Sequence, residues 1–91
     1  MKKNELKIQY QSEFSRVRSI INNYDPIGLI NMGAPDNEYD MEITRIMLIK
    51  EKNDFNILAE EIKKIFIHFF GEQSIFNHSI FIDIAKEILK K

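Results

Sequence analysis

The sequence predicts an all-α domain, a compact orthogonal or bundle-like array of four main helices with a short helical turn after the first. In four segments the apolar residues recur every three or four positions, which is the spacing of one helix face. Gly and Pro, which interrupt helices, gather between the first two segments, where residues 26–35 hold both prolines and two of the three glycines. The chain of 91 residues has the length of one domain, so we expect residues 1–91 to fold together.

The first predicted helix has about 18 residues and ends near Asn23. Its apolar positions follow spacings of three and four, and polar residues occupy the opposite side. Ile8 is the one apolar residue outside this face. The face consists of Leu6, Tyr10, Phe14, Val17, Ile20, Ile21 and Tyr24.

Asp25 and Pro26 end this helix and begin the connecting segment. Pro disfavours the helical conformation at the residue before it, so Tyr24 and Asp25 should be extended. Asp is a common N-cap and Pro a common first helical residue, so we expect Asp25 to cap a short helical or 3₁₀ turn over Asp25–Ile30. Gly33 should close this turn in a conformation that suits glycine. The residues expected to hold the turn on the core are Ile27, Leu29, Ile30 and Met32.

The second predicted helix begins within Asn37–Tyr39 and ends near Glu51, with Asn37 as its expected N-cap. Its apolar pattern is less regular than that of the first helix. A strand over Ile46–Ile49 is the alternative, and the helix is favoured because apolar and polar residues do not alternate there.

The third predicted helix begins at Phe55, with Asn53 or Asp54 as N-cap, and ends at Gly71, where glycine is favoured after a helix. Its apolar residues keep the helical spacing throughout. They are Phe55, Leu58, Ala59, Ile62, Ile65, Phe66 and Phe69.

The fourth predicted helix follows a short loop and has Asn77 as its expected N-cap. Phe76 and Phe81 flank this start and should pack together as a hydrophobic staple. The helix has a broad apolar side that consists of Ile80, Phe81, Ile82, Ile84, Ala85, Ile88 and Leu89.

Charge is unevenly spread, although the net charge is only −1. Residues 1–24 carry five basic and two acidic side chains (+3), residues 25–42 carry five acidic and none basic (−5), and residues 43–91 carry eight basic and seven acidic (+1). The acidic excess argues against a nucleic-acid partner and favours a protein partner with a basic surface.

Composition excludes further classes of protein. The chain has no cysteine, which rules out disulfides and thiolate metal sites. Its apolar runs fall short of the roughly 20 residues that span a bilayer, so we expect no membrane association. Basic residues near the start lack an apolar signal-peptide segment behind them, and a cytoplasmic protein is expected.

The motif around the connecting segment resembles that of a known family. Tyr24-Asp25-Pro26-Ile27-Gly28-Leu29, followed by Ala34-Pro35 and Glu38-Tyr39-Asp40, is similar to the signature of the YugE-like family of small bacterial proteins. The resemblance continues through Phe70-Gly71 and Ala85-x-x-Ile88-Leu89. It implies a small all-α domain of unassigned biochemical function. Similar motifs occur in proteins that resemble immunity proteins of bacterial toxin systems.

Chemical roles for the polar residues are less favoured than structural ones. The acidic residues from Asp36 to Glu42 do not follow an EF-hand pattern, so we expect no metal site and no cofactor. Asp25 and Asp40 are better explained as caps than as a catalytic pair. His68 and His78 lack a spaced partner and are expected at the surface. No catalytic residue is therefore assigned.

These observations favour a non-catalytic protein-binding domain. The expected partner-binding residues are Asp36, Glu38, Tyr39, Asp40 and Glu42, and the expected structural motif is Tyr24, Asp25, Pro26 and Gly28. An immunity protein that neutralises a basic, nuclease-type toxin fits this description. One alternative is a self-associating structural domain, and another is a small carboxylate-dependent metal enzyme. The first alternative is suggested by apolar residues outside the main faces, namely Ile8, Met41, Leu48, Ile57 and Ile67. The oligomeric state stays open.

Overall fold

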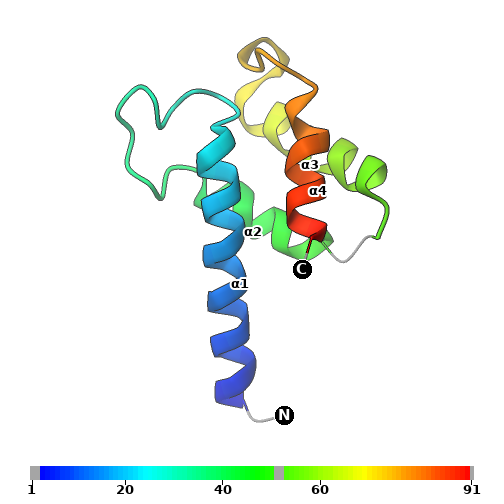
Figure 1. Cartoon of the computed structure of the whole chain (residues 1–91). Coiled ribbons are helices and arrows are strands. Elements are labelled where there is room, and N and C mark those ends of the chain that lie inside the picture. The colour runs from blue at the N-terminus through cyan, green and yellow to red at the C-terminus, as the bar shows by residue number, and fades with distance from the viewer. Residues whose placement is uncertain (1–2, 51–52, 91) are drawn as a thin grey trace.

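The computed structural model describes residues 3–50 and 53–90. Within these ranges the chain forms four α-helices and no strand, which confirms the predicted all-α fold (Figure 1). A short 3₁₀ helix, η1, lies between the last two. The elements are α1 (Lys3–Tyr24), α2 (Asp40–Ile49), α3 (Phe55–Phe70), η1 (Glu72–Ser74) and α4 (Ile80–Leu89).

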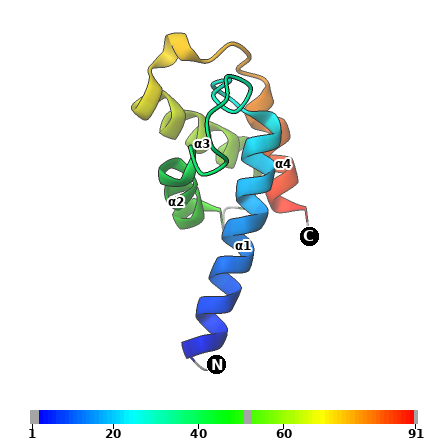
Figure 2. The same ribbon diagram turned by 90° about the vertical axis from the view of Figure 1, so that its left-hand side faces the viewer.

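The four helices surround one core. α1 contacts α2 and α4, and α3 contacts the same two helices from the other side. Seen from the side, α1 runs past α2 and α4, so its N-terminal half extends beyond them (Figure 2). The longest dimension of the molecule, 44 Å, reflects this extension.

Buried apolar residues come from all four helices and from the segments beside them. An aromatic group lies at the centre, where the Tyr39 ring packs edge-on against Phe66 with 5.7 Å between ring centroids. Phe81 lies 5.7 Å from Phe66 on the α4 side. The buried set is Val17, Ile21, Tyr39, Ile43, Ile46, Leu58, Ala59, Ile62, Phe66, Ile75, Phe81, Ile84, Ala85 and Ile88.

α1 ends one residue later than predicted, and Tyr24 is helical rather than extended. The backbone N–H of Asp25 donates to the carbonyl of Ile21 at 2.7 Å, and Asp25 has a φ of 50°, in the left-handed region. Pro26 disfavours the right-handed helical conformation at Asp25, and Asp tolerates the left-handed one better than most residues. α1 therefore ends where Asp25 adopts the left-handed backbone conformation.

The segment after Asp25 forms a series of hydrogen-bonded turns and no continuous helix. The N–H of Gly28 donates to the carbonyl of Asp25 at 3.0 Å, and the N–H of Gly33 donates to that of Ile30 at 3.0 Å. Gly28 and Gly33 have φ values of 84° and 100°, which interrupt helical geometry and favour glycine.

α2 begins at Asp40, later than the predicted start, and Asn37 makes no N-cap. Tyr39 precedes the first helical residue and provides no side-chain cap, because its side chain is in the core. Residues 46–49 are helical, as favoured over a strand. The predicted end at Glu51 lies outside the described residues.

α3 agrees closely with its prediction. Asp54 caps the helix, accepting from the N–H of Asn56 at 2.8 Å and from that of Ile57 at 3.4 Å. Gly71 follows the last residue with a φ of 85°. Both end signals were therefore local and could be recognised from sequence.

The start of α4 differs from its prediction. The Asn77 side chain accepts from the N–H and the hydroxyl of Ser79, at 3.1 Å and 2.6 Å, and so orders the turn that precedes the helix. The helix itself begins at Ile80. The predicted staple is wrong, because Phe76 is 87% exposed while Phe81 is buried.

Candidate functional site

The segment that joins α1 to α2, residues 25–39, is named here the anchored loop. It projects to one side of α1 at the end opposite the N-terminus (Figure 1). Loops longer than about 12–15 residues are uncommon in small domains and are either functional or disordered. The contacts of this loop show that it is ordered by the protein itself.

The Asp25 carboxylate organises the first half of the anchored loop. It accepts hydrogen bonds from the backbone N–H groups of Ile30 and Asn31, at 3.0 Å and 2.9 Å. A third bond, of 2.6 Å, comes from the hydroxyl of Tyr39. Burial opposes ionisation of Asp25, but these hydrogen bonds outweigh it and lower the pKa of the carboxyl.

Tyr39 connects this loop to the core. Its side chain is fully buried, and its hydroxyl oxygen accepts from the N–H groups of Ile27 and Leu29, at 3.2 Å and 3.3 Å. Burial, together with the hydrogen bond to Asp25, raises the pKa of Tyr39. The Tyr39 hydroxyl therefore forms hydrogen bonds with three loop residues, Asp25, Ile27 and Leu29, while its ring packs against Phe66.

The expected structural motif occupies this junction. Tyr24 is half-buried against the core, and Pro26 is buried. Gly28 adopts a φ of 84°, and a β-carbon there would have no atom within 4 Å, so the requirement for glycine is conformational. Asp25 does accept backbone N–H groups, although they lie five and six residues ahead and not at the start of a helical turn.

Asp40 forms an ion pair between α2 and α1. Its two carboxylate oxygens accept from the Arg18 guanidinium, with Nε 2.9 Å from Oδ1 and Nη2 bonded to Oδ2. Arg18 also lies over the ring of Phe14, 5.4 Å from its centroid. Asp40 is thus engaged within the chain and contributes little free charge to the surface.

Glu42 lies inside the protein with 3% of its surface exposed. Among the described residues its Oε1 has no hydrogen-bond partner. Burial, and then the nearby charges of Glu38 and Asp40, raise the pKa of Glu42. Tyr39 and Glu42 were both expected to face a partner, but the structure buries both side chains, Tyr39 just before α2 and Glu42 in its first turn, so neither is accessible at the surface.

Asp36 and Glu38 remain at the surface of the anchored loop. The main-chain carbonyl of Asp36 accepts from the Asn22 side chain at 2.7 Å, which fixes this part of the loop to α1 and leaves the Asp36 side chain in solvent. Met32 is 79% exposed, so it does not hold the turn on the core as predicted. We call Met32, Asp36 and Glu38 together the loop surface.

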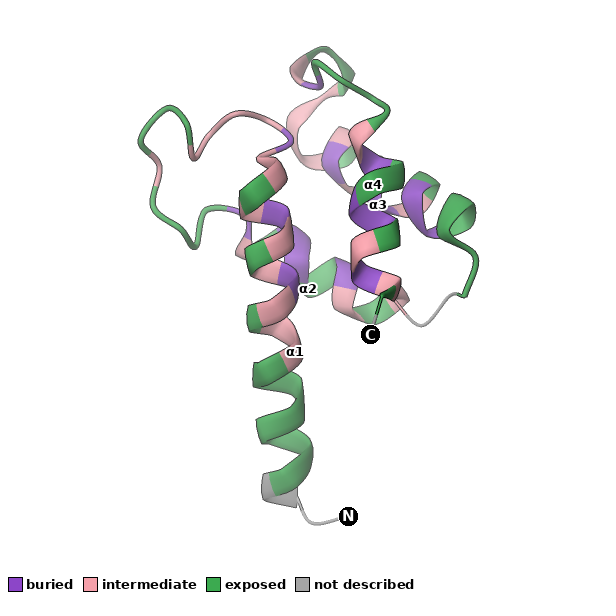
Figure 3. Ribbon diagram, in the orientation of Figure 1, coloured by how far each residue is buried: buried purple, intermediate pink, exposed green. Residues whose placement is uncertain are grey.

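A second surface lies beside the N-terminal half of α1, where exposed residues follow one another along the helix (Figure 3). A groove of 720 Å³ runs between this half and the ends of α2 and α4. Sequence reasoning placed Leu6 and Tyr10 in the core face, yet they are 54% and 48% exposed. The groove is lined by Leu6, Gln9, Tyr10, Glu13, Arg16, Met47, Lys50 and Lys90.

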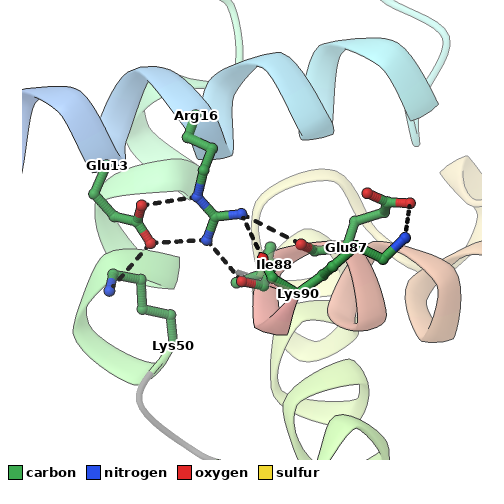
Figure 4. Close-up of polar contacts among 6 residues, drawn as sticks. All are labelled: Glu13, Arg16, Lys50, Glu87, Ile88 and Lys90. Atoms are coloured by element: carbon green, nitrogen blue, oxygen red, sulfur yellow. Dashed lines mark hydrogen bonds and ion pairs between the residues drawn. The ribbon is translucent and has the colours of Figure 1, made fainter.

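Arg16 satisfies the polar groups at the inner end of this groove (Figure 4). Its guanidinium contacts both oxygens of Glu13, at 2.8 Å and 2.9 Å, and the ammonium of Lys50 lies 3.4 Å from Glu13. Hydrogen bonding with Arg16 lowers the pKa of Glu13 to about 2. The same guanidinium donates to carbonyl groups at the C-terminal end of α4, those of Ile88 at 2.6 Å and Glu87 at 3.3 Å, and to that of Lys90, the residue after the helix, at 3.4 Å.

Other kinds of site find no support in residues 3–50 and 53–90. Within these ranges no three His, Asp or Glu side chains are grouped so as to hold a metal ion. His68, on α3, and His78, in the turn before α4, are both exposed. None of the helices in the same ranges has both the length and the apolar character needed to cross a membrane.

Comparison with known proteins adds no relative. No family model, curated protein or solved structure matches the chain. The resemblance to the YugE-like family therefore stays a prediction from the motif.

Proposed function

We propose that this chain is a non-catalytic, cytoplasmic protein-binding domain that presents the loop surface to a protein with a basic surface. The observation that carries the proposal is the bonding of Asp25 to Tyr39, which anchors a long loop to the core. A loop of this length without a role has no evident reason to be held so firmly.

Anchoring the loop lowers the cost of binding. Ordering a flexible backbone costs roughly 1–2 kcal/mol per residue, and a flexible loop would meet that cost when it binds. Here the Asp25 and Tyr39 contacts order the loop when the protein folds. The loop surface is therefore preorganised, which favours affinity for a partner.

The loop surface combines charge with an adaptable apolar side chain. Exposed carboxylates at Asp36 and Glu38 attract a basic surface and increase the rate of encounter. Met32 is long and flexible, so it adapts to the shape of the surface that it meets. An immunity protein that covers the basic active site of a nuclease toxin is the form of this function that we favour.

A carboxylate-based enzyme is less well supported. Asp25 is occupied by three hydrogen bonds, and Asp40 by Arg18. Neither is placed as a free base beside a cleft, which acid–base catalysis needs.

The test uses the purified chain as bait in lysate of its source cells. A loop variant, Asp36→Asn with Glu38→Gln, is compared with the wild type and with a control variant, Glu60→Gln with Asp83→Asn, which removes two exposed charges from α3 and α4. The captured protein is identified, purified and measured in binding kinetics at two salt concentrations.

The loop variant should associate more slowly and show a weaker dependence on salt, while the control variant should behave as the wild type. Met32→Gln should act mainly on the dissociation rate, because the side chain makes contact only in the complex. Unchanged association and dissociation rates in the loop variant would contradict the proposal that the loop surface binds the partner.

A further inference from the structure

We propose that Phe76 is the apolar anchor of the protein-binding surface, and that its ring enters an apolar pocket on a basic protein partner. Phe76 lies in the segment between α3 and α4, residues 71–79, which includes η1 and is named here the α3–α4 loop. The inference rests on the proposed function, because it gives the basic partner of the loop surface a second contact. It also states what that partner carries, which is a pocket for a phenyl ring beside basic residues.

The ring of Phe76 is left in water by the rest of the chain. Of the large apolar side chains in residues 3–50 and 53–90, it has the highest exposed fraction, 87%. Within these ranges the ring packs against no other aromatic ring and lies under no cationic side chain. Phe81, only five residues further on, is buried. The exposure of Phe76 is therefore a property of its own position and not of the whole segment.

The local backbone holds Phe76 outward. Ile75 is buried and its backbone is extended, with φ −97° and ψ 111°. Successive side chains of an extended chain point to opposite sides, so burial of Ile75 directs Phe76 to solvent. The flanks are ordered as well. The N–H of Ile75 donates to the carbonyl of Glu72 at 3.2 Å, and the Asn77 side chain accepts from Ser79.

The α3–α4 loop and the anchored loop lie at the same end of the molecule, opposite the N-terminus of α1 (Figures 1 and 2). Their bases meet in the core, where the ring of Tyr39 packs edge-on against that of Phe70 with 6.2 Å between centroids. Tyr39 ends the anchored loop, and Phe70 directly precedes the α3–α4 loop. A partner seated on this end can thus contact both loops, with Met32 and Phe76 as their most exposed apolar side chains.

Charge complementarity indicates that this partner is basic. Neither loop contains Lys or Arg, so all thirteen of these residues lie elsewhere in the chain. The exposed carboxylates of the two loops are those of Asp36, Glu38 and Glu72. Like charges oppose association, so this end disfavours an acidic protein, the same end of a second copy and an anionic membrane. A protein surface rich in Lys and Arg is the occupant that it favours.

The two kinds of side chain at this end have different roles in binding. Charges at the rim of an interface act mainly on the rate of encounter, whereas a few buried anchors provide most of the affinity. Aromatic residues are enriched among the side chains buried at the centre of interfaces. Because its loop is already ordered, Phe76 loses little more than the rotation of its side chain when it binds. Removal of such an anchor weakens a complex about thirtyfold or more.

Photo-crosslinking of the full chain in its source cells tests the inference. The probe is the amino acid p-benzoylphenylalanine, which replaces Phe76 and on illumination bonds to groups that touch it. The control carries the same probe in place of Leu48, which is 79% exposed in the last turn of α2. Mass spectrometry identifies each crosslinked protein, which is then purified for binding kinetics.

The probe at position 76 should crosslink a protein with an excess of Lys and Arg, and the probe at position 48 should not. With that purified protein, Phe76→Ala should raise the dissociation constant at least about thirtyfold, mainly through faster dissociation. Phe76→Leu, which still fills part of a pocket, should raise it less. Glu72→Gln should slow association at low salt, and Leu48→Ala should leave both rates within about twofold of the wild type.

Stability measurements separate binding from folding. Because the ring is exposed, Phe76→Ala should leave the circular dichroism spectrum unchanged and the melting temperature within about 3 °C of the wild type. A larger fall would mean that the ring supports its own fold, and it would overturn the inference.

Three crosslinking results would also overturn it: no product at position 76, a product with a second copy of the chain, or a product with a protein that has no basic excess. Failure of the proposed function has a different outcome. A basic partner whose association depends on Asp36 and Glu38, but whose affinity ignores Phe76, contradicts the anchor alone. A basic partner that requires Phe76 and ignores those two carboxylates supports the anchor and contradicts the proposed role of the loop surface.

Discussion

The hydroxyl of Tyr39 donates a 2.6 Å hydrogen bond to the carboxylate of Asp25, across fourteen positions of the chain. The phenol ring belongs to the core, and the carboxylate belongs to the loop that leaves α1. This pair therefore transmits the rigidity of the core to a surface segment. Removing this hydrogen bond should make the loop more mobile and leave the helices folded.

Tyr39→Phe tests the hydroxyl apart from the ring. The ring contacts remain, but Asp25 loses a donor, and the N–H groups of Ile27 and Leu29 lose their acceptor. We expect a loss of about 1–3 kcal/mol in the free energy of unfolding, measured by urea titration. Amide hydrogen exchange at the two N–H groups should accelerate, with the far-ultraviolet spectrum unchanged.

Tyr10→Phe is the matched control for that prediction. It removes the same hydroxyl from a half-exposed tyrosine on α1, where water satisfies the group. Its stability should lie within about 0.5 kcal/mol of the wild type. Equal losses in the two variants would mean that the Tyr39 hydroxyl has no special role.

Substitutions of Asp25 separate its backbone conformation from its hydrogen bonds. Asp25→Gly suits a φ of 50° but removes the carboxylate, whereas Asp25→Asn tolerates that φ and keeps one acceptor oxygen. Asp25→Ala neither suits the positive φ nor provides an acceptor. It should therefore lower the free energy of unfolding the most, by about 1.5–3 kcal/mol, measured by chemical unfolding. Asn should cost least and Gly an intermediate amount. A Gly variant as stable as the wild type would show that the carboxylate contributes nothing.

Glu13 should govern part of the acid unfolding. Its pKa is about 2 in the folded protein, below its ordinary value of 4.5, so the folded state favours the ionised form. The stability from Glu13 is therefore complete above pH 4.5 and is lost as the pH falls toward 2. Glu13→Gln should be less stable at pH 7, and its stability should fall less steeply between those values. Glu60→Gln, an exposed control on α3, should preserve the wild-type slope.

Glu42 should have the opposite dependence on pH. Its pKa is raised by burial, so the wild type loses stability as the pH rises above the carboxyl's ordinary value of 4.5. Glu42→Gln should be more stable at pH 7 by about 1–3 kcal/mol, because the variant no longer buries a carboxylate that has one oxygen without a hydrogen bond. The difference should shrink in acid, where the wild-type carboxyl is neutral. Urea unfolding at pH 4 and pH 7 measures this, with exposed Glu60→Gln as control, and a destabilised Glu42→Gln at pH 7 would contradict it.

Local signals made much of the fold predictable. Helical spacing identified all four helices, and a side-chain cap at Asp54 with a glycine at position 71 defined α3 almost to the residue. These signals act over a few neighbouring positions, so one sequence suffices to recognise them. The N-terminal half of α1 is the exception. The spacing of Leu6 and Tyr10 identifies a helix face, but it does not show how far the other helices extend to cover it.

The candidate site was harder to predict because its main contact is long-range. Asp25 beside Pro26 has the composition of a local cap, and nothing in the intervening residues reveals that Tyr39 is its partner. Glu42 was expected to face a partner as part of the acidic segment, but the structure places it inside, where carboxylates are rarely found. Only Asp36 and Glu38 of the expected partner-binding residues stay exposed, so the negative surface is smaller than the sequence charge suggests.

The contacts of Arg16 with the end of α4 determine which sequence changes that end tolerates. Its guanidinium recognises main-chain carbonyls, which every amino acid provides, so substitutions at positions 87, 88 and 90 leave those acceptors in place. Insertions are another matter, since one extra residue within α4 turns the carbonyls by about 100° around the helix axis and shifts them by about 1.5 Å. The last turn of this chain should therefore accept changes of identity during evolution and resist changes of length.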